Sequence, residues 1–206
     1  MDRIVLVICD VWDRHWCRTA NERTSVLAQR IAALLPRVRE LGHLVVHAPS
    51  DTMEFYKDTP QRLRAAQLEK TNPPPDTDLD EPAPPSTDHG GCPDRPPCDR
   101  VDAPPWPWTR QHAAIEIAPG DLITDRGDEV YSAIASLGAT AVAMAGVHTD
   151  RCVLDRPFGI RQLRRWGVDC TLLRDLTEAF WPNETAAILE HIDRHLCRVR
   201  ASDDVF

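Results

Sequence analysis

The chain of 206 residues has no long apolar segment and only two lysines, Lys57 and Lys70. Its longest apolar run, Ile4 to Cys9, is far too short to cross a bilayer. The 24 basic and 32 acidic residues give a net charge of −8, which repels nucleic-acid phosphates and anionic membranes. We therefore expect neither nucleic acid nor membrane as a partner. Nothing before Ile4 resembles a secretory signal.

Seven cysteines are scattered along the chain, an odd number in a protein longer than the small disulfide scaffolds. We expect a cytoplasmic protein, in which thiols serve packing, metal binding or catalysis. These cysteines are Cys9, Cys17, Cys92, Cys98, Cys152, Cys170 and Cys197.

Proline is concentrated in one segment, with 12 of the 18 prolines between Pro73 and Pro107. Because proline has no backbone N–H, residues 72–107 cannot form regular helix or a central strand. The segment is also acidic. We interpret it as a Pro/Asp-rich loop inserted into a single domain spanning residues 1–206. Trp106 in this segment and Trp108 directly after it lead us to expect that part of the insertion packs over the domain.

Strand-like and helix-like segments alternate on either side of this insertion. Residues 4–8 are rich in β-branched side chains, as in a strand buried on both faces, and 24–41 have apolar residues at helical spacing. The pattern predicts an α/β domain with an open, mainly parallel sheet of about six strands and helices on both faces. Further strands are expected at 43–47, 121–124, 141–145, 169–173 and within 198–206, and helices around 128–136, 153–166 and 184–196.

Ligands of such sheets bind at the carboxyl ends of the strands. Asp10 and Cys152 both follow predicted strands and are therefore expected at this edge of the sheet. Cys152 opens a predicted helix, where free N–H groups and the helix dipole would stabilise a thiolate and hold an oxyanion. The alternative is a small buried cysteine. Asp10 follows the most buried strand and could be the general base for the thiol; it could equally be an N-cap or a salt-bridged loop residue.

Aromatic and basic side chains accompany these two residues. Trp12, Trp16 and Trp108 would suit a flat amide or ring substrate, or would anchor the insertion. Arg156 lies one helical turn beyond Cys152 and could bind a substrate carboxylate. The alternative for Arg156 is an ion pair with Asp155 or with the acidic insertion.

Three segments, Ile4–Asp10, Pro119–Arg126 and Gly146–Val153, resemble the isochorismatase-like cysteine hydrolases, which include the nicotinamidases. The resemblance implies a Rossmann-like sheet with Asp10, Arg126 and Cys152 as catalytic residues. It also implies a cis peptide before His148 and an oxyanion hole formed by the backbone N–H groups of His148 and Cys152.

The sequence departs from this family in its basic residue and in its metal motif. The family usually has lysine where Arg126 stands; arginine keeps the charge but does not readily give up its proton. The metal-binding pair that nicotinamidases carry after the second strand is absent, so we expect no cofactor. A structural zinc at His89, Cys92 and Cys98, with Cys17 or His15 as a fourth ligand, is the less favoured alternative to plain packing of the cysteines.

These observations predict a cysteine hydrolase that cleaves a carbon–nitrogen bond of a small amide, imide or ureido compound through a thioester. One alternative is a protein that binds a small molecule without turnover. Another is a vinyl ether hydrolase of the isochorismatase type, which would not need Cys152. We also expect the protein to form a homo-oligomer.

Overall fold

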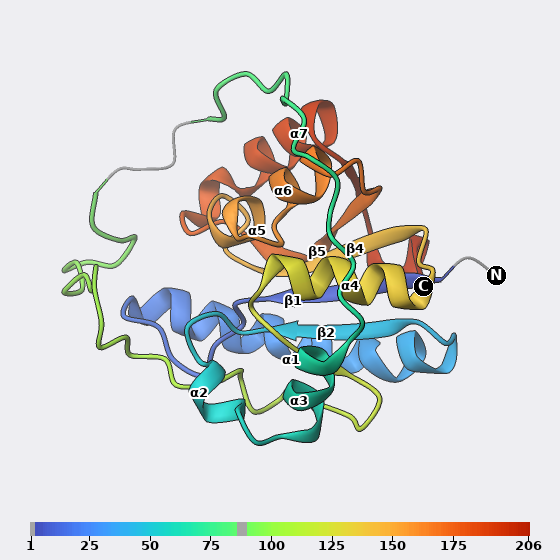
Figure 1. Ribbon diagram of the computed structural model, residues 1–206. Coiled ribbons are helices and arrows are strands. Elements are labelled where there is room, and N and C mark those ends of the chain that lie inside the picture. Colours follow the sequence, from blue (N-terminus) through green and yellow to red (C-terminus); the bar gives the residue numbers. More distant parts are fainter. Residues whose placement is uncertain (1–2, 86–89) are drawn as a thin grey trace.

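The computed structural model describes residues 3–85 and 90–206, and its centre is a six-stranded sheet in the order β3-β2-β1-β4-β5-β6 (Figure 1). All neighbouring strands are parallel. The predicted open α/β sheet is therefore confirmed, including a short edge strand near the C-terminus. The strands are β1 (Ile4–Cys9), β2 (Leu44–Ala48), β3 (Leu122–Ile123), β4 (Ala141–Val147), β5 (Cys170–Glu178) and β6 (Arg198–Arg200).

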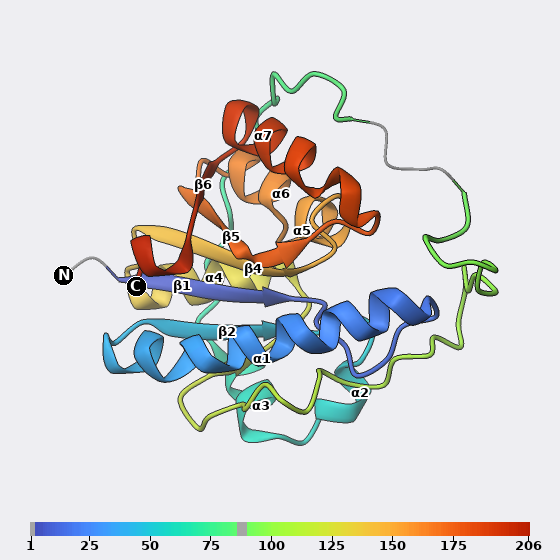
Figure 2. The same cartoon turned by 180° about the vertical axis from the view of Figure 1, so that it is seen from behind.

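Helices cover both faces of the sheet. The long helix α1 lies on one face, in front in Figure 2, and α4 to α7 lie on the other. Two short helices between β2 and the insertion, α2 and α3, were not predicted, because their segments are too short to show a helical period. The helices are α1 (Arg18–Glu40), α2 (Met53–Tyr56), α3 (Pro60–Gln67), α4 (Gly127–Leu137), α5 (Cys152–Asp155), α6 (Ile160–Arg165) and α7 (Thr185–His195), with 3-10 turns at Pro182–Glu184 and Ser202–Asp204.

Strand β1 explains why the apolar residues of the sequence form two core layers. Successive side chains of a strand point to opposite faces. Val5 and Val7 accordingly join the core under α4 to α7, whereas Leu6 and Ile8 pack in the core under α1. Because all four are fully buried, β1 is fixed at the centre of the sheet, and its carboxyl end lies in the middle of the ligand-binding edge.

The helix predicted over 153–166 is wrong as one element, because it is broken into α5 and α6. Pro157 disfavours the helical conformation at the residue before it, and Arg156 is extended (φ −60°, ψ 156°). Gly159 completes the break, since a Cβ there would lie 2.6 Å from the carbonyl oxygen of Leu154. The chain therefore changes direction between α5 and α6, and Arg156 lies at this break.

Glycine is required at Gly146 to bring β4 close to β1. Gly146 has φ 122°, and a Cβ at this position would lie 2.0 Å from the backbone oxygen of Cys9. The two residues are partners in the sheet register. This close approach places the residue after Cys9 beside the turn that leads from β4 into α5.

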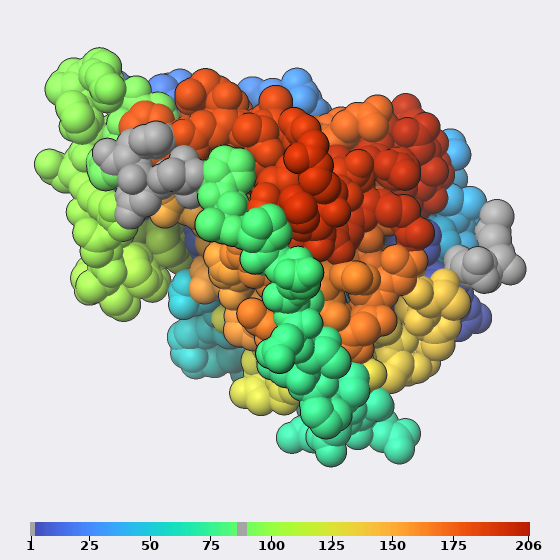
Figure 3. All heavy atoms as spheres, turned by 90° about the horizontal axis from the view of Figure 1, so that it is seen from above, coloured from blue at the N-terminus to red at the C-terminus, as the bar shows by residue number. Residues whose placement is uncertain are grey.

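The insertion crosses the molecule in two parts. Its first part, up to Glu81, runs across α6 and α7, as Figure 3 shows from above. Its second part reaches the carboxyl ends of the strands, on the side away from both termini (Figure 1). No helix among the described residues has the length and apolar character needed to cross a membrane.

Candidate active site

Asp10 lies at the carboxyl end of β1 and is completely buried. Its backbone has φ 52°, a left-handed conformation that residues other than glycine seldom adopt and that is often found at functional sites. The backbone N–H of Ser50, just after β2, donates to Asp10 Oδ1 at 2.8 Å. The carboxylate is thus held in a fixed orientation between two neighbouring strands.

Arg156 forms the ion pair of this carboxylate. Its Nε lies 2.6 Å from Asp10 Oδ2, and its Nη2 lies 3.2 Å from Asp51 Oδ2. The alternative partners expected from the sequence, Asp155 and the acidic insertion, are not the ones observed. Asp51, three residues after the end of β2, was not among the residues that the sequence suggested for this site.

Cys152 is the first residue of α5, and its thiol lies near enough to the Asp10 carboxylate for the two groups to shift each other's pKa. The backbone of His148 also lies near this thiol and acts to lower its pKa. The peptide between Val147 and His148 is cis, as the family resemblance implied. The sequence-predicted residues Asp10, His148 and Cys152 therefore meet at one point.

The thiol of Cys152 is not activated at rest. Burial raises the pKa of the Cys152 thiol well above its usual value, and the negative charge of Asp10 raises it further. The four-residue helix α5 contributes little dipole to offset these two effects. Burial also raises the pKa of Asp10, while the nearby Arg156 charge lowers it.

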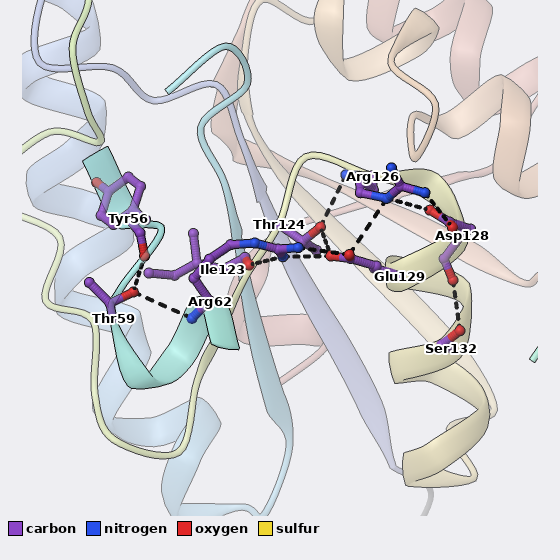
Figure 4. A network of polar contacts seen from close by, with 9 residues as sticks. All are labelled: Tyr56, Thr59, Arg62, Ile123, Thr124, Arg126, Asp128, Glu129 and Ser132. Atoms are coloured by element: carbon purple, nitrogen blue, oxygen red, sulfur yellow. Dashed lines mark hydrogen bonds and ion pairs between the residues drawn. The ribbon is translucent and has the colours of Figure 1, made fainter. Parts of the chain in front are cut away.

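Arg126 does not join Asp10 and Cys152. Its side chain is 58% exposed and lies along the first turn of α4, with Nη2 2.8 Å from Asp128 Oδ2 and Nε 3.5 Å from Glu129 Oε1 (Figure 4). Glu129 is bound in turn by Arg62 and Thr124. The predicted contact of Arg126 with Asp10 is therefore not formed, and Arg156 holds that carboxylate instead. The acidic residues two and three positions after Arg126 were a visible sign of this local pairing.

A cavity of about 550 Å³ opens beside Cys152. Trp12 and Trp108 form one wall, with ring centres 4.1 Å apart and nearly parallel planes, and Trp106 stacks on Trp108 at 5.0 Å. All four substrate-binding candidates, Trp12, Trp16, Trp108 and Arg156, line this cavity. The second part of the insertion adds Gly91, Arg100, Val101, Asp102 and Trp106 to its lining.

The rings of two histidines also line this cavity, although neither ring was predicted there from the sequence. His15 and His148 meet with ring centres 5.4 Å apart. Burial lowers the pKa of His15 to about 4 and that of His148 well below its usual value, so both rings are neutral at pH 7. Within the described part of the chain, neither of the buried ring nitrogens of His148 has a hydrogen-bond partner.

No protein-family model and no curated protein sequence matches the chain. Solved structures do match it at low sequence identity. An isochorismatase family protein from Desulfovibrio vulgaris is 14% identical, with a TM-score of 0.61, covering 100% of this chain and 98% of that one. N-carbamoylsarcosine amidase from Thermoplasma acidophilum is 12% identical, with a TM-score of 0.57, covering 100% and 99%.

Pyrazinamidase of Pyrococcus horikoshii, solved in complex with zinc, is 12% identical, with a TM-score of 0.56, covering 97% of this chain and 99% of that one. These full-length matches show that the chain has the isochorismatase-like fold, as its sequence motifs indicated. At such identities the likeness concerns the fold alone.

Proposed function

We propose that the protein is a hydrolase that cleaves a carbon–nitrogen bond of a small amide, imide or ureido compound, with Cys152 as nucleophile. The contact between the Cys152 thiol and the buried Asp10 carboxylate is the observation that carries this proposal. The amidase and pyrazinamidase among the structures of the same fold support the reaction class.

The proposed reaction begins when Asp10 takes the proton of the Cys152 thiol while the sulfur attacks the substrate carbonyl carbon. A buried carboxylate with a raised pKa is a stronger base than an exposed one, which favours this transfer. The resulting oxyanion accepts hydrogen bonds from the backbone N–H groups of His148 and Cys152. Asp10 then returns the proton to the leaving nitrogen as the carbon–nitrogen bond breaks.

Water hydrolyses the thioester in the second half of the reaction. Asp10 accepts a proton from the water as its oxygen attacks the thioester carbon, and the carbon–sulfur bond breaks. The proton held by Asp10 returns to the sulfur and restores the thiol, so the acid is released and no external base is consumed.

In this scheme Arg156 performs the electrostatic role that the family resemblance gave to Arg126. Its charge, 2.6 Å from Asp10, opposes the effect of burial and favours the ionised carboxylate that accepts the proton. Arginine does not exchange its own proton near neutral pH. The mechanism therefore routes every proton through Asp10.

The cavity favours a small, flat substrate. Its volume of about 550 Å³ is that of a small-molecule site, and the stacked Trp12 and Trp108 present a planar aromatic wall. His148 also lines the cavity, and its neutral ring carries one hydrogen-bond donor and one acceptor that no described residue pairs with.

Ammonia or amine release from a panel of small amides, imides and ureido compounds tests the proposal. Wild type should turn over at least one compound, Cys152→Ala should abolish its turnover, and Cys197→Ala, which alters a distant cysteine, should not. Acid-quenched wild type should carry the acyl group on the Cys152 peptide in mass spectra. Undiminished turnover by Cys152→Ala would refute the nucleophile, and binding without turnover of any compound would favour the ligand-binding alternative.

A further inference from the structure

A second cluster of thiols lies where the insertion meets the start of α1. Cys17 immediately precedes α1, and Cys92, Asp94 and Cys98 belong to the second part of the insertion. One sulfur or carboxylate atom from each of the four lies within 4.8 Å of all the others. Cys17, Cys92 and Asp94 are buried, and Cys98 is partly exposed.

The three sulfur atoms surround a single carboxylate oxygen. Asp94 Oδ2 lies 3.2 Å from the sulfur of Cys17, 3.7 Å from that of Cys92 and 3.0 Å from that of Cys98. The backbone N–H of Thr19 also donates to this oxygen, at 3.3 Å. Four donors exceed the two lone pairs of one carboxylate oxygen, so hydrogen bonding alone accounts poorly for the arrangement.

A tetrahedral zinc ion accounts for the same spacing. With Zn–S bonds of about 2.3 Å and a Zn–O bond of about 2.0 Å, tetrahedral geometry separates each sulfur from the oxygen by about 3.5 Å. The three observed separations, 3.2, 3.7 and 3.0 Å, lie around that value. Three thiolates and one carboxylate would fill all four positions of the ion, as in structural zinc sites.

The surroundings also suit thiolates and a negatively charged cluster. The backbone N–H of Cys98 donates to the Cys92 sulfur at 3.3 Å, and that of Arg18 donates to the Cys98 sulfur at 3.5 Å. The Arg18 guanidinium lies 3.7 Å from Asp94 Oδ1. The positive end of the 23-residue helix α1 adds to these donors, which are the outer contacts that ligating thiolates and carboxylates need.

We propose that Cys17, Cys92, Asp94 and Cys98 bind one Zn²⁺ as a closed structural site that fastens the insertion to α1. Binding releases the three thiol protons to solvent, whereas the aspartate is already ionised, and no oxidation occurs. The ligand set keeps Cys92 and Cys98 of the sequence-based alternative and adds Cys17 and Asp94. His89 lies outside the described residues.

The site is distinct from the proposed catalytic residues but supports the same cavity. Cys17 and Cys92 pack against Phe180, which lines the cavity, and Gly91, the neighbour of Cys92, lines it too. Zinc would thus fix the wall that the insertion contributes. The proposal does not depend on the chemistry of Cys152, and its test measures metal rather than turnover.

The test measures zinc in the full chain, purified in reductant without chelator and after addition of Zn²⁺, by mass spectrometry of the metal. We expect one zinc per chain in wild type and at least a tenfold loss in Cys92→Ser/Cys98→Ser. Asp94→Asn, which keeps the shape of the side chain, should bind zinc at least tenfold more weakly. Cys197→Ser, a cysteine elsewhere in the fold, should keep the full content.

Cobalt provides a second readout that does not rely on the double variant being folded. Co²⁺ added to metal-free wild type should give thiolate-to-metal charge-transfer absorption, which weakens in the single variant Cys98→Ser at the partly exposed position. Less than a tenth of an equivalent of zinc in reduced wild type after Zn²⁺ addition would overturn the proposal. So would full zinc content in the double variant, or a disulfide among Cys17, Cys92 and Cys98 in the freshly purified protein.

Discussion

The Arg156 guanidinium lies 2.6 Å from the Asp10 carboxylate, although the two residues are 146 positions apart in the sequence. The pair joins the end of the first strand to the break between α5 and α6. Arg156 is one-quarter exposed and Asp10 is completely buried, so the pair lies at the boundary between the core and the cavity. At this boundary a charge can act strongly on both the base and the thiol.

Arg156→Ala is expected to lower kcat/KM by roughly a hundredfold, because losing a charged partner at a partly buried site costs a few kcal/mol. Arg126→Ala is the matched control. Its guanidinium is exposed and pairs with Asp128, so the variant should stay within about twofold of wild type. Steady-state kinetics of both variants decide the matter. A large loss in Arg126→Ala with little loss in Arg156→Ala would restore the sequence-based assignment.

Asp10→Asn is expected to have opposite effects on turnover and on thiol reactivity. Turnover should fall by about a hundredfold or more, because the general base is lost. Alkylation of Cys152 by iodoacetamide at pH 8 should become faster, because the Asp10 charge raises the pKa of the thiol and its removal lowers that pKa. In wild type the rate should still be rising above pH 9. Slower alkylation in the variant, followed by mass spectrometry of the Cys152 peptide, would contradict this electrostatic assignment.

Trp108→Ala is expected to raise KM much more than it changes kcat. Trp108 stacks on both Trp12 and Trp106, and each aromatic pair contributes about 0.5–1.5 kcal/mol beyond burial. Loss of this wall should raise KM by roughly tenfold, while Trp108→Phe should recover most of the binding. An unchanged KM with a lower kcat would place Trp108 in the catalytic step instead of substrate binding.

Glu81→Gln is expected to release the first part of the insertion from α6 and α7. Glu81 binds Arg161 through both of its oxygens at 2.7 Å and His191 at 3.0 Å. Although burial opposes the shift, these contacts lower the pKa of Glu81 below 4.5. Its stabilisation is therefore present above pH 4.5 and is lost as the pH falls through the lowered pKa.

Limited proteolysis at pH 7 measures this release. Cleavage between Thr71 and Glu81 should be several times faster in Glu81→Gln than in wild type. Glu54→Gln removes an exposed glutamate of α2 that pairs with Lys57, and it should leave the cleavage rate unchanged. Equal rates for all three proteins would show that the contacts with Arg161 and His191 do not hold the segment.

The sheet and the positions of Asp10 and Cys152 were predictable from the sequence because local patterns determine them. The run from Ile4 to Ile8 identifies a strand buried on both faces, and the carboxyl ends of parallel strands meet at one edge. Any polar residue directly after such a strand is brought to that edge. The tryptophans could be assigned to the cavity by the same argument, since they follow strand ends or precede β3.

The choice between Arg126 and Arg156 could not be predicted in this way. Arg126 follows β3 and Arg156 follows β4, and each has an acidic residue within two positions, so a basic residue after a strand end does not by itself distinguish them. The decision depends on Pro157, which ends α5 and turns Arg156 toward Asp10, a long-range effect of a local break. The pKa of Cys152 was also unpredictable, because it follows from burial and the distance to Asp10 rather than from the start of a helix.

The strand order delays completion of the sheet while the chain is being synthesised. β1 is made first but lies between β2 and β4, and β4 begins only at Ala141. At synthesis rates of about 5–20 residues per second, one edge of β1 waits roughly 5 to 20 seconds for its partner after β2 has been made. An unpaired apolar edge invites association with other chains. Nascent chains arrested before β4 should therefore need chaperone protection, and Asp10 can meet Cys152 only once most of the polypeptide has emerged.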